Sequence, residues 1–145
     1  MEENITIQEP VDQKKKLNIL AIADDSEYGR AAVCHGAMLA AVFSGSLTIV
    51  SRFGFSYEDH SPGIDTDSWL LYAQNVVDHN IETIMLEHYF FPETLYQYAE
   101  ETNTIMYVIG VDRSGKEGFF SIRKALRFIK GSRLPVMTVG TALPD

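Results

Sequence analysis

Apolar runs with the character of β-strands alternate with helical patterns from residue 17 onward. The five runs are LNILAIA, SLTIVSR, NIETIML, TIMYVIG and PVMTVG, and a helical pattern separates each run from the next. Strict alternation of strands and helices favours a parallel sheet with right-handed crossovers and with helices on both faces. LNILAIA is apolar at nearly every position, which is typical of a central strand buried on both faces. The sequence therefore predicts an α/β fold in three layers, with an open parallel sheet of five strands in the middle.

The first two helices are predicted from caps and apolar spacing. A helix over about 27–43 follows Ser26, a predicted N-cap, and Gly45 is predicted to adopt the left-handed conformation that often ends a helix. The turn-rich residues 53–65 are predicted to be a long loop. A second helix over 65–79 has one apolar stripe, formed by Trp69, Leu70, Ala73, Val76 and Val77.

The last two helices are predicted in the same way. The third begins at Pro92, because the first turn of a helix tolerates proline, and its buried face is predicted to hold Leu95, Tyr98 and Ala99. The fourth is FFSIRKALRFIK, in which Ile122, Leu126 and Ile129 are spaced as a buried stripe.

Composition is typical of a globular protein with one domain. The chain has 145 residues, of which 46% are hydrophobic and 22% charged, so it is long enough to bury an apolar core. Residues 1–16 are polar and aperiodic and are predicted to be a flexible tail before a single domain over 17–145. No apolar run reaches the roughly 20 residues of a membrane span, and the tail lacks the apolar core of a secretory signal. A cytoplasmic protein that does not bind membranes is therefore expected.

Charge and cysteine content narrow the function further. The net charge of −8 argues against general binding of nucleic acid, because such binding requires positive charge. The one cysteine, Cys34, cannot form an intramolecular disulfide, in agreement with a reducing compartment. It stands among alanines of a predicted helix, which favours a small core residue over a reactive thiol.

Two turns are the candidate ligand sites. In open parallel sheets, ligands bind beyond the carboxyl ends of the strands, where the winding direction reverses. The turn after the first strand carries Asp24 and Asp25, and the turn after the fourth strand begins at Gly110.

Three segments resemble the universal stress protein family. NILAIADDSEYGRAAV is similar to the family's opening, in which an apolar strand ends in Asp, a small residue and Ser before an amphipathic helix. IETIMLEHYFFPETLYQYAEETNTIMYVIG resembles its third strand, Pro-initiated helix and fourth strand. GSRLPVMTVG resembles its closing turn, proline and last strand. The resemblance covers about residues 17–140 and depends on the order and spacing of these segments.

The resemblance implies a Rossmann-like fold of the adenine nucleotide alpha hydrolase type, with strand order 3-2-1-4-5. It also implies a homodimer that pairs through the last strand and, in one branch of the family, a bound ATP. In that branch the Asp that ends the first strand lies near the ribose and adenine, and Asp24 occupies its place. The other interpretation of Asp24 is a carboxylate that caps nearby backbone N–H groups.

The phosphate loop of that branch has the pattern Gly, two residues, Gly, nine residues, then Gly with Ser or Thr. Gly110 supplies the first glycine, but Arg113 stands at the second, and the final pair falls on Ile122 and Arg123 when one residue is deleted. Glycines let backbone N–H groups come close to a phosphate, whereas a β-branched residue hinders that approach. The sequence therefore predicts that the usual phosphate cradle is lost.

A rebuilt cradle within VDRSGKEGFFSIRK is the alternative. Its glycines retain flexibility, and its basic and hydroxyl side chains are suited to neutralise and bind a phosphate. The candidate nucleotide-binding residues are therefore Asp24, Gly110, Arg113, Ser114, Gly115, Ser121 and Arg123. A purely structural turn is the competing interpretation, because GKEG lacks the spacing and the ending of a P-loop.

The remaining signals are weaker. The four histidines lack the spacing of metal sites and the acids of residues 59–67 lack that of an EF-hand, so no metal site is predicted. The basic residues of the last helix are interpreted as a solvated face, with an acidic partner or nucleic acid as the alternative. Tyr89, Phe90 and Phe91 are interpreted as pocket filling, a subunit contact or aromatics folded onto the sheet edge.

The sequence thus favours a non-enzymatic stress-response module of the universal stress protein type. It is expected to act as a homodimer through protein contacts, without a cofactor and with ATP binding weak or lost. The first alternative is a sensor that binds ATP or AMP through a rebuilt phosphate loop. The second is a small flavodoxin-like cofactor carrier or enzyme, and fold similarity alone does not distinguish the three.

Overall fold

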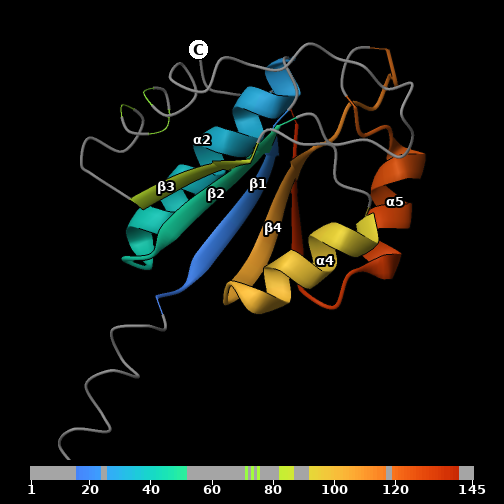
Figure 1. The fold of residues 1–145 in the computed structure, drawn as a ribbon. Coiled ribbons are helices and arrows are strands. Elements are labelled where there is room, and N and C mark those ends of the chain that lie inside the picture. Colours follow the sequence, from blue (N-terminus) through green and yellow to red (C-terminus); the bar gives the residue numbers. More distant parts are fainter. Residues whose placement is uncertain are drawn as a thin grey trace, which may run out of the picture.

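The described residues form one parallel sheet with helices on both of its faces (Figure 1). The structure is a computed structural model, and it describes residues 16–23, 26–51, 71, 73, 75, 82–86, 92–116 and 119–140. In chain order its elements are β1 (Asn18–Ala23), α2 (Glu27–Val42), β2 (Ser46–Ser51), β3 (Glu82–Leu86), α4 (Pro92–Glu101), β4 (Thr104–Gly110), α5 (Ile122–Gly131) and β5 (Val136–Val139).

The strands follow the order β3-β2-β1-β4-β5, and every pairing is parallel. β1 lies in the centre of the sheet, and all six of its residues are buried, as expected for a strand covered on both faces. The predicted α/β class with a parallel sheet is confirmed, and the strand order is the one that the resemblance implied.

The two faces of the sheet carry separate apolar cores. On one face, small side chains of α2 such as Ala32 and Ala37 pack against β1 and β2. On the opposite face, α4 and α5 bury Leu95 and Phe128 beside Tyr107 of β4. Figure 1 shows this division, with α2 on one side of the sheet and α4 and α5 on the other. None of the helices in the described ranges combines the length and the hydropathy that a membrane crossing requires.

The first turn of α2 is capped as predicted. The Ser26 hydroxyl accepts hydrogen bonds from the backbone N–H groups of Tyr28 and Gly29, at 3.2 and 3.4 Å. Glu27 lies in the first turn, where a negative charge is stabilised by the partial positive charge of the helix N-terminus.

The predicted left-handed conformation of Gly45 is wrong, because Ser44 adopts it with a φ of 53°. Gly45 is instead required by space, since a Cβ atom at this position would lie 2.3 Å from the carbonyl oxygen of Leu17. The chain therefore turns one residue earlier than predicted and packs its glycine against the start of β1.

The predicted buried stripe of α5 is also wrong. Ile122, Leu126 and Ile129 are 50%, 56% and 39% exposed, whereas Ala125 and Phe128 are buried against the sheet. The helix begins at Ile122 instead of Phe119, and Ser121 is its N-cap. This short helix has apolar residues on two faces, so spacing alone did not identify the buried one. The face that carries Phe128 packs on the sheet, because its aromatic ring fills the core.

The third predicted helix is confirmed as α4, with Leu95 and Ala99 buried and Tyr98 partly buried. Within the predicted helix over 65–79, the structure describes residues 71, 73 and 75 as helical, and Ala73 is buried in the core on the α2 face. The other residues of that helix, the tail over 1–15, the loop over 53–65 and the aromatics at 89–91 lie outside the described residues.

A buried polar cluster joins three strands at their amino ends. Asn18, only 3% exposed, donates from its side-chain nitrogen to the Thr104 hydroxyl at 2.9 Å. Its side-chain oxygen accepts hydrogen bonds from the hydroxyls of Ser46, at 2.8 Å, and Thr48, at 3.2 Å. These contacts connect β1 to β2 and β4, which fixes the position of the central strand against both neighbours.

Candidate functional site

The turn between β4 and α5 lies at the carboxyl end of the strands and is held by backbone hydrogen bonds. The Val111 N–H donates to the carbonyl of Val139 at 2.8 Å, which connects the turn to the end of β5. The Asp112 N–H donates to the carbonyl of Phe120, also at 2.8 Å, which connects it to the residues before α5. The turn is therefore fixed on two sides.

Asp112 is a fully buried acid at the centre of this turn. Its Oδ1 atom accepts hydrogen bonds from the N–H of Ser114, at 2.9 Å, and from the Ser114 hydroxyl, at 2.6 Å. Its Oδ2 atom accepts one from the N–H of Lys116, at 3.0 Å. A buried carboxylate needs such donors, because burial without them would strongly disfavour its charge.

The backbone N–H groups of Ser114, Gly115 and Lys116 are thus all engaged by Asp112. Gly115 donates to the Asp112 carbonyl at 3.1 Å and has a φ of 72°, a left-handed conformation that glycine adopts at low cost. Successive N–H groups in such a turn form a concavity that binds anions. In this chain the N–H groups of Ser114 and Lys116 bind the protein's own Asp112 carboxylate and the Gly115 N–H binds the Asp112 carbonyl, so the turn as it stands does not fit a phosphate cradle.

Sequence reasoning missed Asp112. The signal was present, because an aspartate followed two residues later by Ser and three residues later by Gly is typical of an Asx-turn. Ser114 and Gly115, the candidates for a rebuilt phosphate cradle, both hold the turn around Asp112, as the competing interpretation of a structural turn describes.

Gly110, the predicted first glycine of a phosphate motif, has a packing role. A Cβ atom at this position would lie 2.0 Å from the carbonyl oxygen of Tyr28 and 2.9 Å from its Cα atom. The end of β4 therefore lies directly against the first turn of α2, and only glycine allows that approach.

The other predicted residues of this turn lie close together in sequence but differ in role. The Ser121 hydroxyl caps α5 by accepting a hydrogen bond from the Lys124 N–H at 3.3 Å. Arg113 and Arg123 are both exposed, and Arg113 borders a groove beside α5.

Asp24 lies outside the described residues, so its predicted contact with a nucleotide stays a prediction.

A groove runs between α5 and β5 next to this turn. Its volume is about 550 Å³, and its apolar lining includes Ile122, Leu126 and Ile129 from α5 and Val139 from β5. These three α5 residues, the α5 stripe, are the partly exposed side chains that the sequence predicted to be buried. Arg123, Arg127 and Lys130 border the stripe on its other side.

Cys34 and His35 have ordinary environments on α2. Burial raises the pKa of the Cys34 thiol, which favours the neutral form over the reactive thiolate. The Nδ1 atom of His35 lies 2.8 Å from the carbonyl oxygen of Ala31, one turn earlier on the helix. Within the ranges that the structure describes, no group of three acids, histidines or cysteines is suited to hold a metal ion.

No protein-family model and no curated protein matches this sequence. Solved structures do match its fold. A universal stress protein in complex with cAMP has a TM-score of 0.61 and 18% identity, over 88% of this chain and 99% of that chain. The universal stress protein from Archaeoglobus fulgidus in complex with dAMP has a TM-score of 0.57 and 17% identity, over 86% and 98%.

A third match is the universal stress protein UspA from Lactobacillus plantarum, with a TM-score of 0.56 and 19% identity, over 86% of this chain and 98% of that chain. Identities this low carry information about the fold and not about the ligand. The chain therefore has the fold of the universal stress proteins along most of its length.

Proposed function

We propose that the protein is a stress-response module of the universal stress protein type that acts as a homodimer, without catalysis and with weak or lost ATP binding. The fold that it shares with universal stress proteins supports the class. The observation that carries the loss of ATP binding is the occupation of the turn after β4 by Asp112.

The argument from Asp112 is electrostatic. A triphosphate bound at this turn would have to displace the Asp112 carboxylate from the N–H groups of Ser114 and Lys116. It would also lie beside that buried negative charge, and like charges at short range repel strongly where water is excluded. Both effects weaken binding of the phosphates, whatever the adenosine contacts contribute.

The homodimer is supported by the surface around β5. β5 is the terminal strand of the sheet, so its outer edge has no partner strand among the described residues. Exposed edges favour pairing with another chain. The α5 stripe lies beside this edge and adds apolar surface that a second copy of the chain would cover.

A melting experiment with ATP, AMP and MgCl2 tests the nucleotide part. A ligand that binds only the folded protein must raise its melting temperature. We expect no shift with millimolar ATP, with or without magnesium. A clear shift, or nucleotide carried through purification, would overturn this part of the proposal.

A second candidate is a sensor for an adenosine monophosphate. Two proteins with this fold have solved structures in complex with cAMP and dAMP, which carry one phosphate each. A single phosphate needs fewer N–H donors than a triphosphate, and the exposed Arg113 and Arg123 are cations near the same turn. A shift with AMP or cAMP and none with ATP would favour this candidate over the first.

The mass of the full chain in solution tests the dimer part. Light scattering during gel filtration should give twice the mass of one chain. A single-chain mass at high micromolar concentration would contradict the homodimer and leave the nucleotide part unaffected.

A further inference from the structure

A second cavity has no lining residue, among those that the structure describes, in the turn after β4. It has a volume of about 300 Å³ and lies between α4 and the connection from α5 to β5. Tyr107 of β4 lines it and pairs with Val136, the first residue of β5. The turn after β4 instead follows Gly110, which pairs with Val139, the last residue of β5. The side chains that give the cavity its chemistry are those of Glu93, Tyr96, Glu100, Tyr107 and Arg133.

Tyr107 lines this cavity and carries a buried hydroxyl group. Only 1% of the residue is exposed, and among the described residues its hydroxyl has no hydrogen-bond partner. Its ring packs edge to face against Tyr96 and Phe128, with centroids 6.0 and 5.1 Å away. Buried tyrosine hydroxyls usually find a partner, so an unpaired one in a cavity wall indicates a position for an external group.

The charges around the cavity favour a cation. Glu93 and Glu100 contribute two carboxylates, and Arg133 is the single cation among the lining residues that the structure describes. Burial, followed by the negative charges of Tyr96 and Glu100, raises the pKa of Tyr107, so its hydroxyl stays protonated. Burial and then Glu93 raise the pKa of Tyr96 in the same way.

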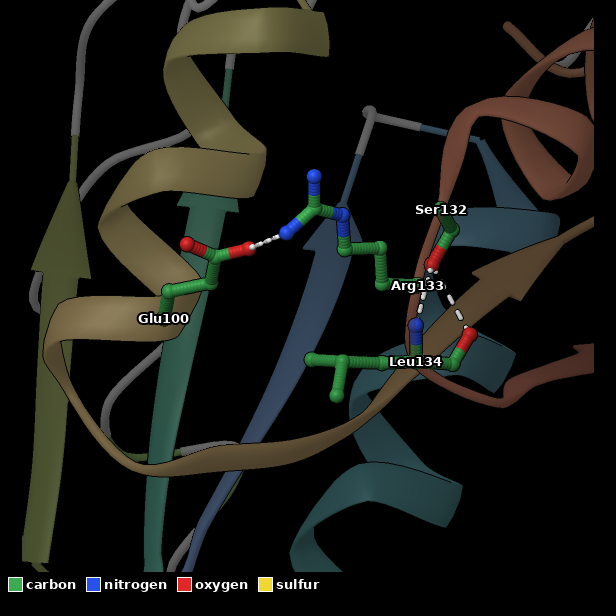
Figure 2. A network of polar contacts seen from close by, with 4 residues as sticks. All are labelled: Glu100, Ser132, Arg133 and Leu134. Atoms are coloured by element: carbon green, nitrogen blue, oxygen red, sulfur yellow. Dashed lines mark hydrogen bonds and ion pairs between the residues drawn. The ribbon is translucent and has the colours of Figure 1, made fainter.

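Arg133 already forms an ion pair with one carboxylate of the cavity. Figure 2 shows Glu100 on α4 and Arg133 on the connection pointing toward each other, with 3.4 Å between the Arg133 nitrogen and the Glu100 oxygen. The connection is ordered by Ser132, whose hydroxyl donates to the Leu134 carbonyl at 2.8 Å and accepts from the Leu134 N–H at 3.0 Å. The pair is largely exposed, so a second cation meets a carboxylate that is only weakly held.

We propose that this cavity binds a small organic amine. Its ammonium group would lie between the carboxylates of Glu93 and Glu100, and the Tyr107 hydroxyl would accept a hydrogen bond from it. The ring of Tyr96, which is only partly buried, would contact the carbon atoms of the ligand, and aromatic rings also attract cations. The volume matches a molecule of metabolite size.

The test uses the full chain and 1,4-diaminobutane as the probe. Binding is measured by calorimetry and by NMR shift mapping, and 1,4-butanediol at the same ionic strength is the neutral control. We expect binding of the diamine, shifts centred on α4 and the start of β5, and no binding of the diol. Absence of diamine binding at millimolar concentration, or equal binding of the diol, would overturn the proposal.

Three variants locate the site. Tyr107→Phe removes only the unpaired hydroxyl, and Glu100→Gln removes one carboxylate, so each should weaken binding about tenfold. Glu101→Gln is the matched control, because Glu101 is an exposed acid on the same helix that does not line the cavity. An equal effect of Glu101→Gln would mean attraction to the general negative charge and would overturn the proposed site.

The stability of Tyr107→Phe without ligand separates binding from structure. A hydroxyl without a protein partner costs free energy when buried, so its removal should leave the melting temperature unchanged or raised. A clear loss of stability would mean that the hydroxyl is bound internally through ordered water, and would overturn its assignment as a ligand group.

Discussion

A Cβ atom on Gly110 would lie 2.0 Å from the carbonyl oxygen of Tyr28. The end of β4 and the first turn of α2 thus approach so closely that no side chain fits between them. Because the nearest atoms belong to the backbone of a capped helix turn, rotation of a side chain cannot relieve the contact. Gly110→Ala should therefore lower the free energy of unfolding by about 2 kcal/mol or more.

Urea unfolding followed by circular dichroism checks this prediction. Gly140→Ala is the matched control, because a Cβ atom there would meet nothing within 4 Å. A Gly110→Ala protein as stable as the control would show that the strand and the helix can separate at low cost.

The alternation of strands and helices was sufficient to predict the layers of the fold. Each apolar run was long enough to define a strand; the start of α2 followed from the Ser26 cap, and that of α4 from the tolerance of a first helical turn for Pro92. The face of α5 was not predictable in the same way, because Phe128 competes with the apolar stripe for the core. Which of two apolar faces is buried depends on the space that the sheet leaves, and the sequence of the helix does not contain the shape of that space.

The candidate site was predictable in position and not in chemistry. Parallel sheets place their functional turns beyond the carboxyl ends of strands, and the turn after β4 is one of these. The role of each residue depends on partners that the sequence does not reveal. Gly110 is required by Tyr28 from another element, and the N–H groups that the alternative of a rebuilt phosphate cradle would use are engaged by Asp112.

Asp112→Asn should destabilise the protein by about 1–3 kcal/mol, because an amide offers one acceptor oxygen where the carboxylate offers two. The N–H groups of Ser114 and Lys116 are bound by different oxygens of Asp112, so one of them would lose its Asp112 acceptor. Chemical unfolding at neutral pH is the measurement. Ser114→Ala is the control and should cost less than about 1 kcal/mol, since both backbone donors keep their acceptor. Equal losses would contradict the central role of the carboxylate.

Asn18→Ala should lower the free energy of unfolding by about 2–3 kcal/mol, because it leaves several buried hydroxyl groups with fewer partners. The Asn18 side chain contacts the hydroxyls of Ser46, Thr48 and Thr104 on both neighbouring strands. Asn75→Ala, at an exposed helical position, should change stability by less than about 0.5 kcal/mol. If both variants unfold at the same urea concentration, the polar cluster does not stabilise the sheet.

Leu126→Asp should convert the proposed homodimer to a monomer. Leu126 is 56% exposed in one chain and lines the groove beside β5, so a charge there would be buried in the dimer without a partner. Val42→Asp is the control, because Val42 is 77% exposed on α2 and does not line that groove. Light scattering of both variants decides the matter. A Leu126→Asp protein that keeps the mass of a dimer would place the contact elsewhere.

Tyr96 should make stability fall with rising pH above pH 10. Burial, followed by the negative charge of Glu93, raises the pKa of Tyr96 from 10.0 to about 12. Its hydroxyl donates a hydrogen bond of 2.7 Å to the carbonyl of Phe128, and this bond requires the proton. Between pH 10 and pH 12 the unfolded chain loses this proton while the folded chain keeps it. Stability is therefore fully present below pH 10 and decreases across that interval.

Tyr96→Phe isolates this contribution. The variant should be less stable than the natural chain by about 1 kcal/mol below pH 10, because it lacks the hydrogen bond to Phe128. Its free energy of unfolding should then fall less steeply as the pH rises from 10 to 12, since one titrating group is gone. Urea unfolding of both proteins across this range gives the two slopes. Parallel curves would show that the phenol of Tyr96 titrates alike in the folded and unfolded chains.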